Sequence, residues 1–300
     1  MKNKILVAGA TGNLGERIVR ALVQKGASVS AVVRATTDSA KVNHLESLGV
    51  NVHRLQQWNI AELTAACRDV SCVVSALAGL RPVIIDAQKM LVEASIASGV
   101  PRFIPSDYSL DFTAFRHGEN RNLDLRREFH RYLDQTPITS TSIFNGAFMD
   151  LLTGDMPMIF FKQKWVLHWG DKNHRLLFTT MDDTAAYTAN VALDTSSPRY
   201  LRIAGDRISP SEIRTVLNEM TGEKFKRIRT GKQTMLGIII KLAKTFSPSK
   251  DELYPAWQGM QYMHNMIDKR SVISRLDNDR YAGMHWTDVK KYLEENGHAA

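Results

Sequence analysis

Residues 4–15, KILVAGATGNLG, decide the fold, because a short apolar run passes through a glycine-rich turn into a helix-forming segment. The run from Lys4 to Ala8 has the length of a buried strand, and residues 14–25 have the apolar spacing of an amphipathic helix. A strand, a turn with glycine at every third position and a helix, in this order, predict a site where the backbone meets a dinucleotide pyrophosphate.

The glycines of this turn have a chemical reason. The first N–H groups of a helix lack an intrahelical partner and favour an anion, and a Cβ at the point of closest approach would keep the pyrophosphate away. The alternative is a tight turn that merely contains glycines, but the strand before it and the helix after it favour the nucleotide site. We expect the cofactor to contact Gly9, Thr11, Gly12, Asn13, Leu14 and Gly15.

Short apolar runs and longer helical patterns alternate through residues 1–150, which is typical of βαβ units. Expected strands are 4–8, 28–33, 50–55, 70–76, 102–105 and 139–144, and expected helices are 14–25, 41–48, 60–68, 82–98 and 119–134. The fold class is therefore α/β, a Rossmann-type doubly wound parallel sheet with a smaller, mostly helical C-terminal substrate domain. We expect the nucleotide-binding domain over 1–152, with about 176–204 returning to it, and the substrate domain over 153–300.

In the second half of the chain the regular alternation of strand and helix patterns ends. Its pattern predicts a hairpin of strands 165–169 and 176–180, a helix from about 182 to 193 and a strand over 200–204. Ser209 and Glu212 have the spacing of a capping box, which predicts another helix start. The basic stretch from Lys224 to Lys232 is interpreted as an exposed strand whose charges face water, rather than as a nucleic-acid patch.

Composition bounds the class of protein. The hydrophobic fraction of 44% permits a substantial core, and no apolar stretch approaches the roughly 20 residues of a membrane span. Cys67 and Cys72 fit neither a disulfide framework nor a zinc site, so we expect buried thiols in a cytoplasmic protein. The histidines show no metal-binding spacing, and we expect neither a metal nor a membrane or nucleic-acid partner.

The residue that closes the second expected strand selects the cofactor. An acidic side chain there would bind the ribose hydroxyls of NAD, whereas this chain has Arg34, and Lys41 follows at the next helix start. A guanidinium binds a 2′-phosphate with two hydrogen bonds, and a lysine adds a point charge. A solvated arginine at a strand end is the alternative. The pair predicts NADP, with NADPH preferred over NADH.

A third part of the expected cofactor site lies at the end of the fourth strand. Ser75, Ala76 and Leu77 are small enough to let a ribose and nicotinamide cross the sheet edge, where cofactors of open α/β sheets bind. Packing of these small residues against helices explains them equally well.

Several motifs together resemble one known family. The glycine-rich turn, Arg34, VVSALAG at 73–79, RFIPSDYSLDF at 102–112 and SIFNGAF at 142–148 occur in the same order as in the NmrA-like family of atypical short-chain dehydrogenase/reductases. The isoflavone reductase-like plant enzymes belong to that family. The resemblance extends from residue 1 to about 204. It implies NADP(H) binding, and it adds Ser106 and Asn145 to the expected cofactor contacts.

The chain departs from the plant reductases at two places. They carry Pro-Ser-Glu-Phe-Gly where this chain has Pro-Ser-Asp-Tyr-Ser at 105–109, so the loop loses a glycine. The family register also places Arg126 where those enzymes have a catalytic lysine. An arginine stays protonated and does not act as a general base. It still supplies a positive field, and His130, four residues later on the same helix face, is a candidate proton donor or a structural histidine.

Hydride transfer from a nicotinamide cofactor is the reaction that remains once other common catalytic motifs are excluded. None of the eight tyrosines has a lysine four residues later, and no G-x-S-x-G nucleophile turn occurs. The favoured interpretation is an NAD(P)H-dependent oxidoreductase that reduces a small carbonyl, quinone or aromatic compound, with Arg126 and His130 as catalytic candidates. The alternative is a catalytically weak regulatory protein that senses NADP(H).

Overall fold

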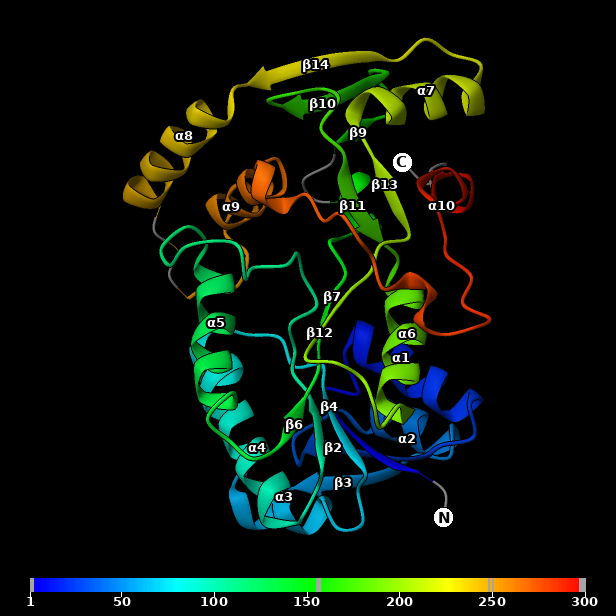
Figure 1. Cartoon of the computed structure of the whole chain (residues 1–300), viewed down its shortest axis with the longest axis vertical. Helices are drawn as coiled ribbons and strands as arrows, with labels where there is room; N and C mark the ends of the chain where they lie inside the picture. Colours follow the sequence, from blue (N-terminus) through cyan, green and yellow to red (C-terminus); the bar gives the residue numbers. More distant parts are fainter. Residues whose placement is uncertain (1–2, 155–157, 248, 250, 297–300) are drawn as a thin grey trace. The chain divides into compact units, whose positions relative to one another are not determined.

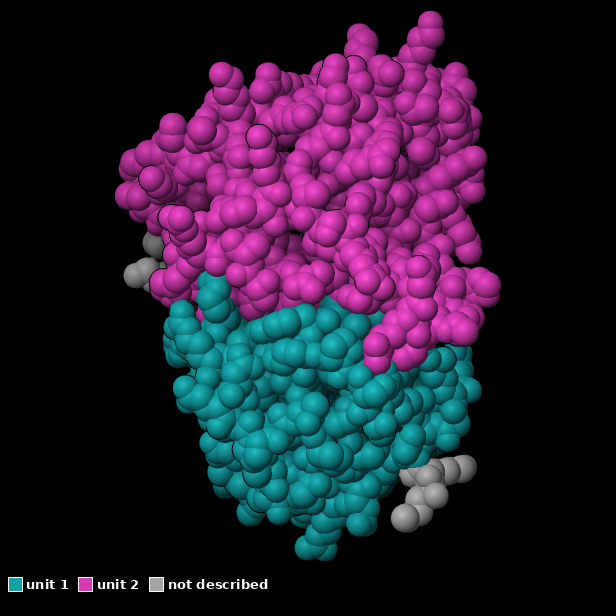
Figure 2. Space-filling model, viewed as in Figure 1, with its two compact units in different colours: residues 1–108, 125–143, 184–201 teal, residues 109–124, 144–183, 202–300 magenta. Residues whose placement is uncertain are grey.

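We describe the protein from a computed structural model, which describes residues 3–154, 158–247, 249 and 251–296. The chain divides into two compact units, coloured separately in Figure 2. Unit 1 comprises residues 1–108, 125–143 and 184–201, and unit 2 comprises 109–124, 144–183 and 202–300. The chain passes between the two units at residues 108–109, 124–125, 143–144, 183–184 and 201–202.

Unit 1 contains a six-stranded parallel sheet in the order β3-β2-β1-β4-β5-β6. This order defines a doubly wound Rossmann-type sheet, in which the chain reverses its direction of travel at β1 and β4. Its strands are β1 (Lys4–Ala8), β2 (Ser28–Arg34), β3 (Asn51–Leu55), β4 (Cys72–Ser75), β5 (Arg102–Ile104) and β6 (Thr139–Ser140).

Helices cover both faces of this sheet, as Figure 1 shows, with α3, α4 and α5 on one face and α1, α2 and α6 on the other. Their bounds are α1 (Asn13–Gln24), α2 (Ser39–Ser47), α3 (Ile60–Ala66), a π-helical turn η1 (Pro82–Ala87), α4 (Gln88–Ala97), α5 (Arg121–Leu133) and α6 (Met181–Leu193). Glycines at 26, 49 and 99 have φ between 70 and 80° where α1, α2 and α4 end, as left-handed C-terminal caps require.

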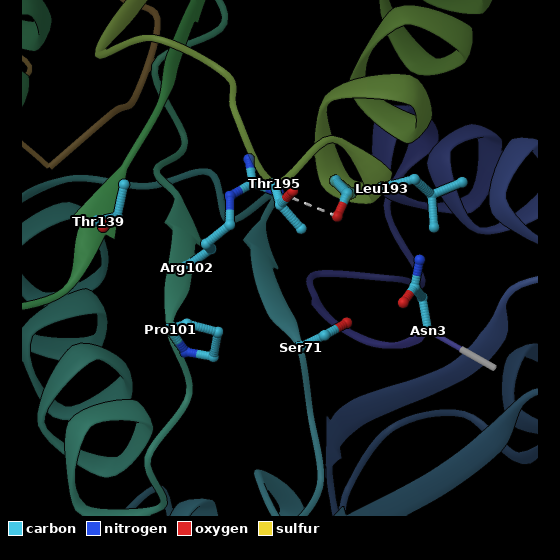
Figure 3. Close-up of a pocket in the computed structure, with 8 residues that line it drawn as sticks. Asn3, Ser71, Pro101, Arg102, Thr139, Leu193 and Thr195 are labelled. Carbon is cyan, nitrogen blue, oxygen red and sulfur yellow. Dashed lines mark hydrogen bonds between the residues drawn. The ribbon is translucent and has the colours of Figure 1, made fainter. Parts of the chain in front are cut away.

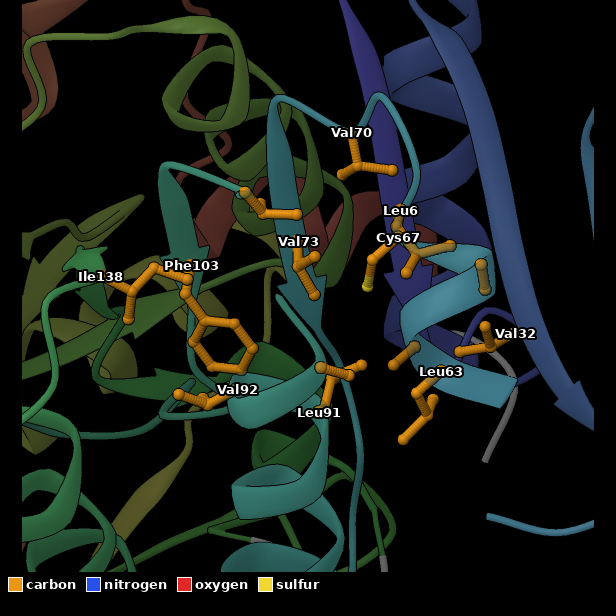
Figure 4. Packing of buried hydrophobic residues seen from close by; sticks show 14 of the residues in the cluster. Leu6, Val32, Leu63, Cys67, Val70, Val73, Leu91, Val92, Phe103 and Ile138 are labelled. Carbon is orange, nitrogen blue, oxygen red and sulfur yellow. The ribbon is translucent and has the colours of Figure 1, made fainter. Parts of the chain in front are cut away.

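One apolar cluster fills the space between the sheet and α3, α4 and α5. Leu6, Val73 and Phe103 project from the strands towards Leu63 of α3 and Leu91 of α4 (Figure 4). These strands are buried on both faces, which explains their nearly continuous apolar runs. Cys67 belongs to the same cluster, and burial raises the pKa of its thiol to about 11 and that of Cys72 to about 12. Both cysteines are free, buried thiols, as the sequence predicted.

Unit 2 holds two three-stranded sheets, in the orders β14-β10-β9 and β13-β11-β8. The chain also forms a two-stranded ladder of β7 with β12. These strands are β7 (Ser142–Phe144), β8 (Ala147–Phe148), β9 (Ile159–Phe160), β10 (Trp165–Trp169), β11 (Leu176–Thr179), β12 (Tyr200–Arg202), β13 (Asp206–Ile208) and β14 (Lys226–Gly231).

The remaining helices give the C-terminal third its mostly helical character. They are α7 (Pro210–Thr221), α8 (Gln233–Phe246), α9 (Ala256–Met266) and α10 (Val289–Asn296), with the 3-10 turns η2 (Met149–Leu152), η3 (Lys269–Ser271) and η4 (Asn278–Arg280). The capping box at Ser209 and Glu212 is present at the start of α7, as its spacing predicted. No helix of the described residues is long and apolar enough to cross a bilayer.

The hairpin expected over 165–180 was wrong. Both strands exist, but β10 pairs with β9 and β14 while β11 pairs with β8 and β13. The turn between them bonds elsewhere: the N–H of Gly170 donates to the carbonyl of Gly231, and the N–H of Ser211 donates to the carbonyl of Lys172. A sequence pattern identifies strands but does not name their partners, so long-range pairing prevailed over the local turn.

Candidate functional site

The glycine-rich turn joins β1 to α1 at the carboxyl edge of the parallel sheet. Gly9 has a φ of 87°, and a Cβ on it would lie 2.6 Å from the carbonyl oxygen of Ala76 at the end of β4. A Cβ on Gly15 would lie 2.0 Å from the carbonyl oxygen of Gly9. Since real side chains do not make such contacts, these two glycines bring strand, turn and helix together at van der Waals distance.

Gly12 has a different surrounding. It is exposed and caps α1 without a side-chain hydrogen bond, and a Cβ on it would meet only the carbonyl oxygen of Gly9, at 3.3 Å. By helix geometry the first N–H groups of α1, from Asn13 onward, have no intrahelical acceptor. The open side of Gly12 and these N–H groups form a cradle of the kind that holds a pyrophosphate, so the residues present fit a dinucleotide.

Arg34 is the last residue of β2, and its side chain is exposed, as is that of Lys41 in the first turn of α2. The nearby carboxylate of Asp38 is engaged as the N-cap of α2, where its Oδ1 accepts a hydrogen bond from the N–H of Ala40 at 2.8 Å. The end of this strand is cationic, because the arginine and the lysine are exposed while the carboxylate of Asp38 is hydrogen-bonded to the backbone of α2. Such an end suits a 2′-phosphate better than a pair of ribose hydroxyls.

The ends of β4 and β5 are tied together by Ser106. Its hydroxyl donates to the carbonyl of Leu77 at 2.6 Å, and its N–H donates to Oε1 of Gln88 at 3.1 Å. Ser75, two residues before Leu77, is fully buried, and its hydroxyl has no hydrogen-bond partner among the residues that the structure describes. Of the sequence-predicted contacts, Ser75, Ala76, Leu77 and Ser106 therefore gather at the same edge as the glycine-rich turn.

Arg126 lies on α5 and is buried, with 9% of its surface exposed. Its Nε donates to the carbonyl of Ser106 at 3.1 Å, which fixes the guanidinium beside the end of β5. The sequence could place Arg126 on a helix and in a family register, but the contact that anchors it joins residues twenty positions apart.

His130 lies one helical turn after Arg126 and forms a buried pair with Asp107. Its Nε2 is 2.6 Å from Oδ2 of Asp107, and both side chains are almost fully buried. Burial by itself would raise the pKa of Asp107, but the charge of His130 and its hydrogen bond outweigh burial and lower that pKa below the ordinary value. The hydroxyl of Ser142 accepts a hydrogen bond from Arg199 at 2.6 Å and lies 3.2 Å from His130.

Tyr200 completes this group by stacking on the ring of His130, with the ring centres 6.1 Å apart. Sequence reasoning gave no site role to five residues of this group: Gln88, Asp107, Ser142, Arg199 and Tyr200. The only available signal was polarity within otherwise apolar segments, because nothing local indicates that Gln88 accepts a bond from Ser106.

Asn145 belongs to unit 2, where it follows β7. Its side chain is fully buried, and neither Oδ1 nor Nδ2 has a partner among the described residues. Its backbone is fixed, since the N–H donates to Ser109 and the carbonyl accepts from the hydroxyl of Thr179. A buried amide without partners is costly, which makes Asn145 a candidate for contact with a ligand.

A pocket of about 210 Å³ lies at the opposite, amino edge of the sheet, where Asn3, Ser71, Pro101 and Thr139 line it (Figure 3). Its arginine, Arg102, donates to the carbonyls of Val191 and Ala192 and to the hydroxyl of Ser197. This guanidinium caps the C-terminus of α6, where helix carbonyls favour a cation. The pocket is therefore separate from the candidate cofactor edge.

Among the described residues no group of three or more His, Cys, Asp or Glu side chains could hold a metal ion.

The fold and the glycine-rich edge together define a Rossmann-type α/β protein with a cradle that fits a dinucleotide. The sequence model of the NmrA-like family matches residues 1–292, and the chain belongs to that family. It is 28% identical over 259 residues to "Pinoresinol reductase 1" of Arabidopsis thaliana, which covers 79% of this chain and 80% of the relative. It is 26% identical over 248 residues to an "NmrA-like family domain-containing oxidoreductase" of Gibberella moniliformis, covering 76% and 80%.

Solved structures share the fold over almost the whole chain. The structure "AtPrR2 with NADP+ and (+)pinoresinol" has a TM-score of 0.81 at 22% identity and covers 98% of this chain and 99% of its own. An NADPH-dependent quinone oxidoreductase of Escherichia coli, complexed with NADPH, has a TM-score of 0.69 at 18% identity, with coverage of 97% and 99%. The Rossmann-type architecture expected from the sequence is thereby confirmed.

Substitution at Gly12 and at Gly15 should separate binding from folding. Gly12→Val should abolish NADPH binding and lower the melting temperature only slightly, since φ of −86° and ψ of 164° suit valine and its Cβ would be tight only against the carbonyl oxygen of Gly9. Gly15→Ala should lower the free energy of unfolding by roughly 1–3 kcal/mol, because its methyl group meets backbone. Calorimetric titration and thermal melting measure the two effects. Undiminished NADPH affinity in folded Gly12→Val would refute the cradle.

Replacement of Arg34 should reduce the preference for NADPH over NADH. A charge-assisted bond to a 2′-phosphate contributes about 1.5–3 kcal/mol, so Arg34→Ala should weaken NADPH binding roughly tenfold or more and leave NADH binding almost unchanged. Arg68→Ala is the matched control, because Arg68 is also exposed but precedes β4 at the amino edge of the sheet. Equal affinities of the wild type for the two nucleotides, by titration calorimetry, would contradict the assignment.

The buried Asp107–His130 pair should make stability depend on pH. The pKa of the Asp107 carboxyl is lower in the folded protein than its unfolded value of 3.8. The ionised carboxylate therefore stabilises the fold above pH 3.8, and this stabilisation is lost as the pH falls through the folded pKa. Asp107→Asn should cost about 3–5 kcal/mol at neutral pH, and the difference from wild type should shrink below pH about 4. Urea unfolding at several pH values tests this, with exposed Asp86→Asn as control. A difference independent of pH would mean that the pair contributes no charge-dependent stability.

Proposed function

We propose that the protein is an NADPH-dependent reductase that transfers a hydride to a small carbonyl, quinone or aromatic compound. The observation that carries this proposal is the open cradle at Gly12. It lies at the sheet edge between the parallel neighbours β1 and β4, where the strand order reverses and the connections leave the two strands in opposite directions. Ligands of open α/β sheets bind at this point. The names of the relatives, which include reductases of pinoresinol and a quinone, support both the cofactor and the substrate class.

The cofactor contacts that we propose follow the carboxyl edge of the sheet. The turn would hold the pyrophosphate, Arg34 and Lys41 the 2′-phosphate, and Ser75, Ala76, Leu77 and Ser106 the nicotinamide ribose. The unpartnered side-chain amide of Asn145, which belongs to unit 2, stays a predicted contact. When bound, NADPH supplies the hydride, and the protein supplies position and electrostatics.

Arg126 would support the reaction by charge. A carbonyl or quinone oxygen that receives electrons becomes negative, and a guanidinium fixed near it stabilises that charge. Arg126 suits this task because it is buried and its Nε donates a hydrogen bond to the carbonyl of Ser106. The guanidinium therefore needs little reorganisation when the charge develops. The proton that completes the reduction would come from water, since a guanidinium stays protonated.

His130 would act as a positioning residue rather than as a proton donor. Its ring is enclosed by Asp107, Ser142 and Tyr200, and it lies one turn from Arg126 on the same helix. This packing fixes α5 against the loop that follows β5. The result is a rigid support for Arg126 and Ser106, which are joined by a hydrogen bond.

A second function, NADP(H) sensing without turnover, is favoured by one observation. Arg126 stands where the family register places a catalytic lysine, and a guanidinium stays protonated and does not act as a general base. A protein of this kind would bind NADPH through the same edge and reduce nothing.

Substitution at Arg126 should distinguish the two functions. With NADPH and a panel of quinones and aromatic aldehydes, Arg126→Ala should slow turnover by roughly 10²-fold, the usual loss for one electrostatic stabiliser. Arg126→Lys should retain NADPH affinity and part of the rate, because it keeps the charge. The wild-type rate should show no basic limb from Arg126, whereas the lysine variant should acquire one.

Arg127→Ala is the control for this experiment, since Arg127 is the next residue of α5 and is only half-buried. It should leave turnover within about twofold of wild type. Wild-type turnover in Arg126→Ala would remove the proposed catalytic role. Tight NADPH binding with no reduction of any member of the panel would replace the reductase by the sensing protein.

A further inference from the structure

The positive charge of the protein is concentrated in one segment. Residues 224–250 contain eight lysines and arginines and no aspartate or glutamate. The whole chain has 39 basic and 31 acidic side chains, so the rest of it carries 31 of each and is balanced. The entire formal excess of +8 therefore resides in fewer than one tenth of the residues.

The structure builds this segment from an edge strand and a helix of unit 2. β14 lies at the edge of the sheet β14-β10-β9, and α8 follows it directly, with Lys232 as its N-cap. The exposed basic side chains at described positions are Lys224, Lys226, Arg229, Lys232, Lys241 and Lys244. No ion pair within the described part of the chain involves Lys226, Arg229, Lys232 or Lys241, so their charges are available to a partner.

α8 also exposes a row of large apolar side chains, which we call the apolar stripe: Met235, Ile238, Leu242 and Phe246. Their exposed fractions are 46%, 59%, 53% and 82%, and their spacing of three, four and four residues places them along one face of the helix. Leu236 and Ile240 are buried instead, where α8 packs against α9 (Figure 1). An exposed apolar row of this kind marks an interaction surface.

We propose that the apolar stripe of α8 and the basic residues of β14 and α8 form a docking surface for an anionic lipid bilayer. Helices that lie in a membrane interface combine large apolar side chains on one face with lysines and arginines beside them. Anionic headgroups attract a polybasic segment, and the long stem of Lys241 lets its ammonium group reach those headgroups while the stripe enters the acyl boundary. This docking is peripheral and uses no membrane-spanning helix.

Two other occupants fit the charges less well. A second copy bound through the same patch by a two-fold axis would bring eight excess positive charges against eight, which is repulsive. A nucleic acid would use the charges but leave four large apolar side chains without a role. The interpretation of residues 224–232 as a solvated strand face explains β14, but it does not explain the stripe that follows. A peripheral bilayer partner differs from the expectation, drawn from the sequence, of no membrane partner.

Flotation of the full chain with lipid vesicles tests the proposal. The protein should bind vesicles of phosphatidylcholine mixed with phosphatidylserine, bind pure phosphatidylcholine at least tenfold more weakly, and lose binding as the salt concentration rises. Binding should not require NADPH, because none of the residues of this surface is a proposed cofactor contact. Failure of the reductase assay would therefore leave this test intact.

Variants separate the two parts of the surface. The pair Ile238→Gln and Leu242→Gln should reduce binding more than tenfold, because two large side chains no longer leave water. Val272→Gln is the control, since Val272 is 61% exposed in unit 2 outside the stripe. The pair Lys232→Gln and Lys241→Gln should reduce binding by about fivefold for each charge, against Lys290→Gln and Lys291→Gln of α10. Unchanged melting temperatures establish that the variants are folded.

Three results would overturn the lipid assignment. Absence of binding to phosphatidylserine vesicles would do so directly. Self-association in sedimentation that disappears in the Ile238 and Leu242 variant would identify a second copy as the occupant. Binding of a random duplex DNA that depends on the lysines but not on the stripe would identify a nucleic-acid surface.

Discussion

The approach of two backbones at the carboxyl edge of the sheet is the constraint on which the rest of unit 1 depends. The Cα of Gly9 lies so close to the carbonyl of Ala76 that no side chain fits between them, and the same is true of Gly15 and the carbonyl of Gly9. These contacts join β1, β4 and α1 where the strand order reverses. Because the chain leaves β1 and β4 in opposite directions here, the edge stays open to a ligand while the strands beneath it are fully buried.

A second layer of polar contacts holds the neighbouring strand end to that edge. Ser106 bonds to Leu77 and Gln88 on one side and to Arg126 on the other, so one loop residue connects β4, α4 and α5. The buried Asp107–His130 pair fixes the next residue of the loop to the same helix. Each of these groups is satisfied by a partner far away in sequence, and together they make the position of Arg126 a property of the packed unit rather than of its own helix.

Cationic side chains are arranged in two different ways in this protein. At the cofactor edge a few cationic groups are placed one by one, with Arg34 and Lys41 exposed at a strand end and Arg126 buried on α5. In the segment 224–250 many cationic groups are spread along an edge strand and a helix and accompany an apolar stripe. The first arrangement suits recognition of one small anion by defined hydrogen bonds. The second suits a broad anionic surface, where the total charge matters more than the geometry of any one contact.

The sequence by itself determined the strand, turn and helix at residues 4–25, the alternation of the parallel sheet and the left-handed helix ends, because each is fixed by local sterics or by burial on a regular period. It also indicated Arg34 and the capping box at Ser209. Only the tertiary structure decided that β10 and β11 belong to different sheets, that Ser106 links Gln88 to Arg126, and that His130 is paired with Asp107. The stripe on α8 was likewise hidden, because a period of apolar residues does not tell which face the core will cover. Those features depend on contacts between residues far apart in the chain, whose partners are chosen by packing and not by any local preference.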